Sequence, residues 1–161
     1  LNQLDGDYTV IGIDAYRPPY IPLHMTTVEF FQEVSDHLAD DGVAVINVGR
    51  TATDRRLVAA LGNTMSYIFP SVHTMDVPAS FNTIIVATKQ PTSADNLAAN
   101  LAQLPPDAHP LLVRILQDGT QALVETEYND ILFTDDRAPV ETITDSLVLN
   151  FLVGGGTESL R

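Results

Sequence analysis

The sequence contains no cysteine. A chain without cysteine has no disulfide, no thiol nucleophile and no cysteine-ligated zinc site, and this absence favours no cellular compartment. No apolar run approaches the ~20 residues that a membrane-spanning helix needs, and no signal peptide is visible. We expect a cytoplasmic location for the chain.

Basic residues are scarce. The 161 residues include 8 Lys and Arg against 21 Asp and Glu, which gives a net charge of −13. Binding to nucleic acid or to an anionic membrane surface requires a cationic cluster, and the sequence has none. A cationic ligand such as a polyamine is favoured electrostatically, although many acidic proteins bind nothing cationic. The 45% hydrophobic and 18% charged content predicts one folded domain with a sizeable core.

Common motifs for phosphate, metal and acyl chemistry are also missing. No Gly-x-Gly-x-x-Gly follows an expected strand, and neither a P-loop nor a Gly-x-Ser-x-Gly elbow occurs. The four histidines show no metal-ligand spacing: His24, His37, His73 and His109. We therefore expect no metal ion and no tightly bound cofactor.

The most informative stretch runs from Tyr8 to Thr27. Val10, Ile11 and Ile13 form a short apolar run, which predicts a parallel strand that is covered on both faces. Asp14 follows where this run stops. Ligands of open α/β sheets bind beyond the carboxyl ends of the strands. Asp14 is therefore a candidate for chemistry.

A proline-rich loop follows Asp14. Each proline fixes φ and pushes the preceding residue toward extended geometry, so a stiff loop is expected over residues 17–21. The side chains expected to project near Asp14 are Tyr16, Arg17, Tyr20 and His24. They offer aromatic faces, a permanent cation and a titratable ring. An ordinary structural role, with tyrosines capping the core and an arginine paired with an acid, stays open for each.

The next segment predicts a helix and a second strand. Thr26 is the expected N-cap, and Glu29 completes a capping box. The buried helix face is expected to contain Phe30, Phe31, Val34 and Leu38. Gly42 suits the end of this helix, and residues 43–48 read as a buried strand. A strand, a helix and a strand with short connections predict a right-handed crossover between parallel strands.

Further elements are expected beyond residue 50. Thr53 is expected to cap a helix that closes at Gly62, and residues 65–69 to form a third strand. Residues 70–78 read as a loop or an irregular strand, and residues 83–89 as a fourth strand. The short link between these strands predicts an antiparallel pair at the sheet edge. Residues 154–161 are expected to form a mobile tail.

Two acids precede the last expected helix. Asp135 and Asp136 form either a metal or amine site, or a helix cap with a turn acid, since Pro139 and Glu141 follow as in a first helical turn. We favour the capping role for one of the two acids and leave the other open.

Three motifs together carry a family resemblance. YTVIGIDAYRPPYIPLHMTTVEFF, LADDGVAVINVGR and LFTDDRAPVE resemble the C-terminal half of the spermidine synthase-like family, over about residues 7–145. These are aminopropyltransferase-like proteins on the S-adenosylmethionine methyltransferase fold, and some are fused to membrane segments. The resemblance therefore leaves open that the chain is the cytoplasmic domain of a membrane-fused parent protein. The resemblance implies an α/β fold over residues 1–153: half of a Rossmann-like sheet that lacks the N-terminal nucleoside-binding half. About four strands are expected, mostly parallel with an antiparallel edge pair, and with helices on both faces.

The resemblance also implies an activity. Members of the family transfer an aminopropyl group from decarboxylated S-adenosylmethionine, as cosubstrate, to a small amine. Asp14 matches the acid that binds the attacking amine and accepts its proton. The substrate-binding residues implied are Tyr16, Arg17, Tyr20, His24, Asp135 and Asp136. Without its nucleoside half the isolated chain is expected to be inactive, and its unpaired strand edge predicts a homo-oligomer.

Arg17 departs from the family pattern. It occupies the position of a second acid, where it would repel a cationic amine and could instead bind a carboxylate. Two alternatives therefore stay open: a non-catalytic binding or assembly module, and an S-adenosylmethionine-dependent methyltransferase with the same fold.

Overall fold

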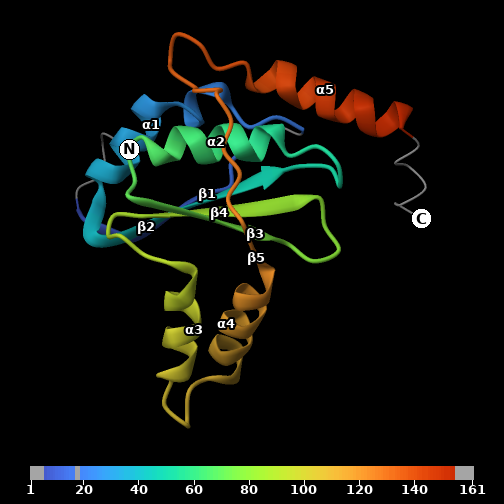
Figure 1. The fold of residues 1–161 in the computed structure, drawn as a ribbon. Coiled ribbons are helices and arrows are strands. Elements are labelled where there is room, and N and C mark those ends of the chain that lie inside the picture. Colours follow the sequence, from blue (N-terminus) through green and yellow to red (C-terminus); the bar gives the residue numbers. More distant parts are fainter. Residues whose placement is uncertain (1–5, 17–18, 155–161) are drawn as a thin grey trace.

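Five strands and five α-helices make up the described part of the chain (Figure 1). The structure is a computed structural model that describes residues 6–16 and 19–154. The strands are β1 (Tyr8–Ile13), β2 (Leu38–Gly49), β3 (Ser71–Asp76), β4 (Asn82–Thr88) and β5 (Leu123–Val124). The helices are α1 (Val28–Asp36), α2 (Arg56–Ser66), α3 (Ala94–Ala102), α4 (Pro110–Ala122) and α5 (Val140–Val153), with a 3-10 turn at Leu23–Met25.

The strands form one mixed sheet in the order β1-β2-β4-β3-β5. β1 pairs with β2 in parallel, whereas the pairs β2–β4, β3–β4 and β3–β5 are antiparallel. The α/β class is confirmed, but the sheet is more antiparallel than expected. The reason is that β4 turns back from β3 and inserts beside β2. β1, β2 and β3 consequently point the same way, and their carboxyl ends meet at one edge.

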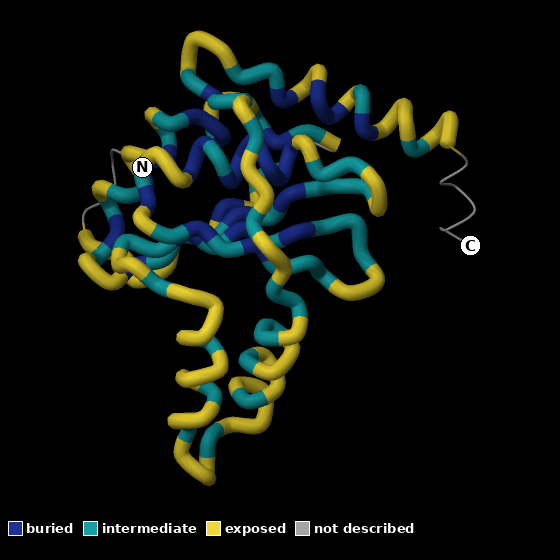
Figure 2. Tube along the Cα trace, viewed as in Figure 1, coloured by how far each residue is buried: buried dark blue, intermediate teal, exposed yellow. Residues whose placement is uncertain are grey.

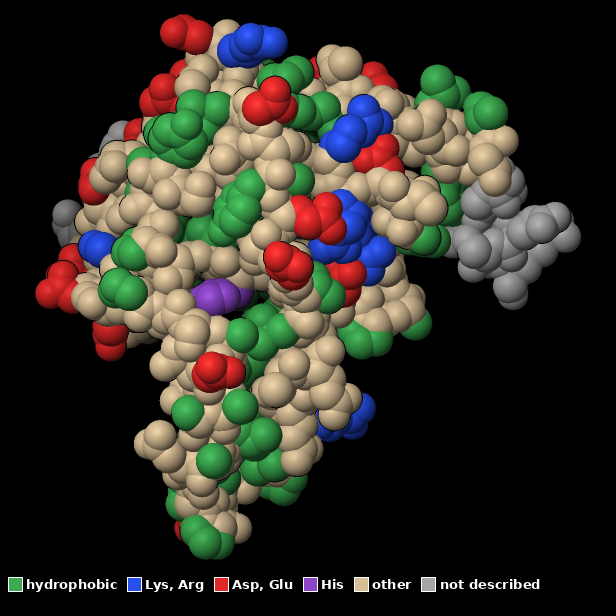
Figure 3. All heavy atoms as spheres, in the orientation of Figure 1, with side chains coloured by type: hydrophobic (Ala, Val, Ile, Leu, Met, Phe, Trp, Pro, Cys, Tyr) green, Lys and Arg blue, Asp and Glu red, His purple; other side chains and the backbone are tan. Residues whose placement is uncertain are grey.

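Helices cover one face of the sheet more fully than the other. Alternate residues of β2 and β4 are buried on the side of α1 and α2: Ala44, Ile46, Val48, Thr83, Ile85 and Ala87. The intervening residues of both strands are only half-buried. On the other side, α3 and α4 form a hairpin that stands away from the sheet (Figures 1 and 2). Leu111, Leu112 and Ile115 stay exposed on this hairpin, whose surface shows many hydrophobic side chains (Figure 3).

β1 is an edge strand. Its expected unpaired edge is confirmed for the described residues, since β1 pairs with β2 alone. The expectation that both faces of β1 are covered is wrong, because Val10 is 60% exposed on the open face whereas Ile13 is 5% exposed.

The first helix and the second strand begin and end at other residues than expected. The N-cap is Thr27, whose Oγ1 accepts a hydrogen bond from the Phe30 amide at 3.2 Å. The hydroxyl of Thr26 instead donates to the Leu23 carbonyl at 2.6 Å. α1 ends at Asp36, and β2 begins at Leu38, well before Gly42. Parallel pairing of Leu38 with Tyr8 draws these residues into the sheet.

The third strand also differs. Residues 65–69 were expected to be extended, but α2 continues past Gly62 to Ser66, and β3 lies within the segment expected to be a loop or irregular strand. Val58, Leu61 and Met65 explain the longer helix, because they share one helical face and all are buried. Thr53 is not the cap of α2, since Arg55 occupies that position. Apart from Gly154, the tail expected to be mobile lies outside the described residues.

Phe133 joins the C-terminal segment to α1 and α2. Its side chain is fully buried, its amide donates to Thr64 Oγ1 at 3.2 Å, and its carbonyl accepts from the Val28 amide at 2.9 Å. We expect Phe133→Ala to lower the free energy of unfolding by about 3–5 kcal/mol, because it leaves a cavity among packed side chains. Urea denaturation measures this loss, with Tyr67→Ala, at a 65% exposed aromatic residue, as the control. Equal losses in the two variants would contradict this packing role.

Candidate functional site

Asp14 lies at the carboxyl end of β1, beside the neighbouring strand β2. Its carboxylate is exposed, and Asp14 Oδ1 accepts a hydrogen bond from Asn47 Nδ2 at 3.2 Å. The opposite orientation of the Asn47 amide would bring its oxygen against the carboxylate, so the negative charge fixes the amide. Asn47 Oδ1 is buried and has no hydrogen-bond partner among the described residues. Asp14 is thus positioned by a neutral donor.

Tyr16 stands next to this pair. Its hydroxyl donates to the Asn47 main-chain oxygen at 2.7 Å. Burial raises the pKa of Tyr16 to about 12, a hydrogen bond from the Gly49 backbone opposes this rise, and the negative charge of Asp14 adds to it. Tyr16 therefore stays protonated at neutral pH, and its hydroxyl remains a hydrogen-bond donor to Asn47.

Beside Tyr16 an apolar pocket of about 350 Å³ opens between the strand ends and α5. Its lining comprises Tyr16, Pro19, Ile21, Gly49, Arg50, Thr51, Leu57, Phe81, Asn82, Thr144, Leu147, Val148, Phe151 and Leu152. Phe81 and Phe151 pack edge to face, with ring centroids 5.3 Å apart. This volume lies within the about 300–1,000 Å³ typical of small-molecule sites.

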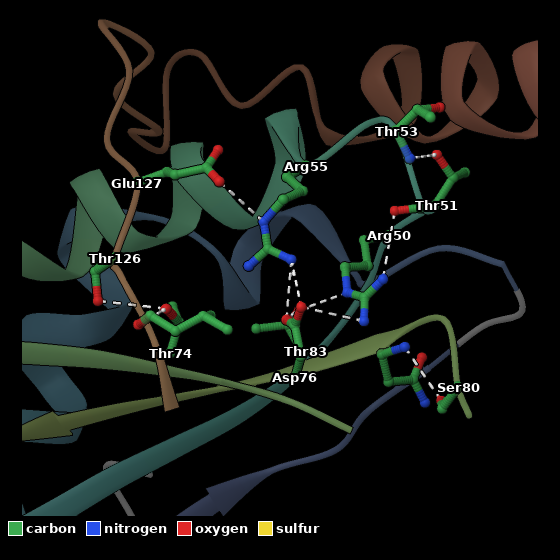
Figure 4. Close-up of polar contacts among 12 residues, drawn as sticks. Arg50, Thr51, Thr53, Arg55, Thr74, Asp76, Ser80, Thr83, Thr126 and Glu127 are labelled. Atoms are coloured by element: carbon green, nitrogen blue, oxygen red, sulfur yellow. Dashed lines mark hydrogen bonds and ion pairs between the residues drawn. The ribbon is translucent and has the colours of Figure 1, made fainter. Parts of the chain in front are cut away.

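An ionic cluster lies where β2 and β3 end and β4 begins (Figure 4). Asp76, at the end of β3, accepts from Arg55 Nη1 at 2.8 and 2.9 Å and from Thr83 Oγ1 at 2.6 Å. Arg50 Nη2 lies 3.3 Å from Asp76 Oδ2, and Arg50 Nε donates to Thr83 Oγ1 at 3.0 Å. Arg55 Nε lies 3.2 Å from Glu127 Oε1, close enough for an ion pair, but is not aligned for a hydrogen bond. The cluster holds the ends of β2, β3 and β4 together.

Apart from Tyr16, the predicted site residues that the structure describes do not gather around Asp14. His24 and Asp135 line a separate hollow of about 300 Å³ beside α1. Tyr20 reaches α5, where its hydroxyl donates to Asp145 Oδ1 at 2.6 Å, and this bond raises the pKa of Tyr20. Arg17 lies outside the described residues.

The two acids before α5 do not cap it. The N-cap position of α5 is Pro139, with no side-chain cap. Asp135 instead accepts from Thr27 Oγ1 at 2.7 Å, and its amide donates to Glu29 Oε2 at 3.1 Å, so it joins the N-terminus of α1. Asp136 is exposed. The expected capping role is therefore wrong, because the bridge between Thr134 and Arg137 turns this segment toward α1.

Sequence reasoning missed the roles of Asn47, Asp76 and α5. Asn47 could have been found from the parallel pairing, because it is the next-to-last residue of the apolar run 43–48, and that run was expected to pair with the strand that ends before Asp14. Asp76 and the pocket wall from α5 depend on contacts between distant segments, which no local pattern shows.

Within residues 6–16 and 19–154, no three His, Asp or Glu side chains are grouped to hold a metal ion. None of the helices in that part of the chain has the length and apolar content needed to cross a membrane.

Comparisons with known proteins agree with the resemblance. No protein-family model matches the chain. A "Probable polyamine aminopropyl transferase" from Bifidobacterium longum (strain NCC 2705) is 27% identical over 151 residues, which cover 84% of this chain and 34% of that protein. A "probable spermidine synthase" from Corynebacterium glutamicum ATCC 13032 aligns with a TM-score of 0.51 at 22% identity, over 78% of this chain and 49% of that one.

The similarity to the curated relative supports a spermidine synthase-like family for the chain. The solved structure supports the fold alone. The chain spans about a third of the length of the curated relative.

The pKa of Asp76 yields a first prediction at this site. Burial alone raises that pKa, but hydrogen bonds from Thr83 and Arg55 and the charges of Arg55 and Arg50 together outweigh it, so the pKa is lowered. The stabilisation is therefore present above the unfolded pKa of about 3.9 and is lost as pH falls through the folded value. We expect Asp76→Asn to cost about 1–3 kcal/mol at pH 7 and progressively less below about pH 4. Urea denaturation across pH 3–7 measures it, and a pH-independent difference would contradict the ionic role.

Tyr16 yields a second prediction. Because its pKa is raised from 10.0 to about 12, its stabilising effect is present below the unfolded pKa and is lost as pH rises toward the folded value. We expect the stability of the wild type to fall more steeply than that of Tyr16→Phe between about pH 10 and 12. Ultraviolet titration should also show that this variant lacks a late-titrating phenol. If the stability of the wild type and of Tyr16→Phe falls equally with pH, the Tyr16 hydroxyl does not have the raised pKa.

Proposed function

We propose that the chain is the acceptor-side half of a spermidine synthase-like transferase domain. In the complete protein, it would transfer an aminopropyl group from decarboxylated S-adenosylmethionine to an amine. The observation that carries this proposal is Asp14, an exposed carboxylate at a strand end, held by Asn47 beside Tyr16 and an apolar pocket. The similarity to the aminopropyl transferase supports it.

The chemistry requires a neutral amine and an acceptor for its proton. The amine nitrogen attacks the methylene bonded to the sulfonium sulfur, the N–C bond forms, and the C–S bond breaks with its electron pair passing to sulfur. The attacking nitrogen then loses a proton. Asp14 is suited to accept this proton, because its carboxylate is exposed and its Asn47 contact is neutral. Tyr16, with a pKa of about 12, is too weak an acid to serve as a base at neutral pH.

The nucleoside half of the site is proposed to lie outside the 161 residues. The chain covers 34% of the curated relative and 49% of the solved structure, so there is room for such a half in proteins of this kind. The sequence has no glycine-rich loop after a strand with which to hold a nucleoside. The assigned span of residues 1–153, the homo-oligomer, the inactivity of the isolated chain and a cytoplasmic location stay predictions.

The substrate-binding roles also stay predictions. Tyr16 keeps its role in the proposal because it lines the pocket and contacts Asn47. His24 and Asp135 do not line the pocket beside Tyr16, since they line the hollow beside α1. Tyr20 could connect the loop to α5 through Asp145.

The test uses the complete protein that carries this chain, supplied with decarboxylated S-adenosylmethionine and a panel of amines. We expect Asp14→Asn to lower kcat by about 10²–10⁴-fold, the usual contribution of a positioned acid or base. Chromatographic release of methylthioadenosine measures the rate. Asp41→Asn, at an exposed acid of β2, is the matched control and should retain the wild-type rate. Wild-type turnover in Asp14→Asn would remove Asp14 from the mechanism.

A further inference from the structure

The pocket beside Tyr16 has an unusual charge pattern for a protein that handles amines. Most of its wall is aliphatic or aromatic: Ile21, Leu57, Phe81, Leu147, Val148, Phe151 and Leu152. Arg50 is the one charged side chain among its lining residues in the described chain. The described lining of the pocket therefore offers an apolar surface and no carboxylate.

The charge of Arg50 is already compensated. Arg50 Nη2 pairs with Asp76 at 3.3 Å, and Arg50 Nε donates to Thr83 at 3.0 Å. Its side chain is 12% exposed and is held by β3 and β4, so it is not free to turn toward a ligand anion. A ligand in the pocket would thus meet a wall without net charge.

This pattern separates two kinds of amine. A diamine or polyamine would bring its second ammonium group into the apolar pocket, whose described lining residues supply no carboxylate to pair with it. Burying an unpaired charge is costly, and in practice the group would have to lose its proton. An amine with a single nitrogen and an apolar body would instead bury only hydrocarbon.

The overall charge of the chain favours a cationic ligand. The chain carries a net charge of −13, which attracts cations. Tyr16 lines the pocket, and Tyr16 and Asp14 both hydrogen-bond to Asn47, at 2.7 and 3.2 Å. One ammonium group near Asp14 can therefore be combined with an apolar chain past Tyr16.

We propose that this pocket binds the apolar body of a primary monoamine, with its nitrogen at Asp14. This names an acceptor class for the proposed transfer, and it rests on the proposed role of Asp14. The acceptor is a hydrophobic monoamine, whereas a diamine such as 1,4-diaminobutane is a poor fit.

The test is calorimetric titration of the 161-residue chain with hexylamine and 1,6-diaminohexane, which have equal carbon length. We expect hexylamine to bind at least about tenfold more tightly, because only the diamine buries a second charge. Affinity should rise about fourfold for each methylene added from butylamine to hexylamine. Equal or tighter binding of the diamine overturns the inference.

Two variants locate the binding site. Leu152 lines the pocket but is 56% exposed, so Leu152→Ser should leave the fold intact and weaken hexylamine binding about tenfold or more. Leu111→Ser, at a 58% exposed leucine of α4, is the matched control and should leave affinity unchanged. Asp14→Asn should weaken hexylamine but not 1-hexanol. Unchanged hexylamine affinity in Leu152→Ser overturns the proposed site.

The remaining outcomes are also decisive. If hexylamine does not bind, the inference is wrong. Dissociation of a dimer by Leu152→Ser in light scattering would then show that the pocket is a contact between copies. If hexylamine binds as expected but Asp14→Asn retains full transfer activity in the complete protein, the inference holds and the proposed function fails. If transfer depends on Asp14 but requires a diamine, the proposed function holds and the inference fails.

Discussion

The central position of β2 determines the geometry of the whole candidate site. β2 pairs in parallel with β1 along one edge and antiparallel with β4 along the other. This register aligns Asn47 with both Asp14 and Tyr16, and it brings Arg50 to the sheet edge where β3 ends and β4 begins. A one-residue slip of β2 would turn Asn47 toward the helices and leave Asp14 without its donor. The pairing of β2 with its neighbours therefore determines the positions of the side chains in the candidate site.

The charged side chains at this edge are of two kinds: some pair with one another, whereas Asp14 contacts only a neutral amide among the described residues. Arg50, Arg55 and Asp76 compensate one another, with Glu127 close to Arg55, and they fasten three strand ends. Asp14 has a different environment, since its contact among the described residues is the neutral amide of Asn47. An acid that is held in place but not neutralised can receive a cation or a proton. This difference is why Asp14, and not Asp76, is the candidate for chemistry.

Local patterns in the sequence predicted what depends on neighbouring residues. The apolar run before Asp14 and the strand after α1 were sufficient to predict two parallel strands, and they place Asp14 at a strand end as the structure has it. Patterns failed where tertiary contacts decide between similar options. Thr27 replaces Thr26 as the cap, and Met65 continues a helix instead of starting a strand. The pocket wall from α5 lies about a hundred residues from Gly49, so it could not be read from either segment alone.

We propose a transferase site that is divided between this chain, which supplies the acceptor side, and a nucleoside-binding half outside it. Calorimetric titration of the 161-residue chain with methylthioadenosine tests this division most directly, because that nucleoside is the product of the proposed transfer. We expect no measurable heat of binding with methylthioadenosine, and the same result with decarboxylated S-adenosylmethionine. Saturable binding of either molecule would mean that these residues build the nucleoside site themselves, and it would contradict the division.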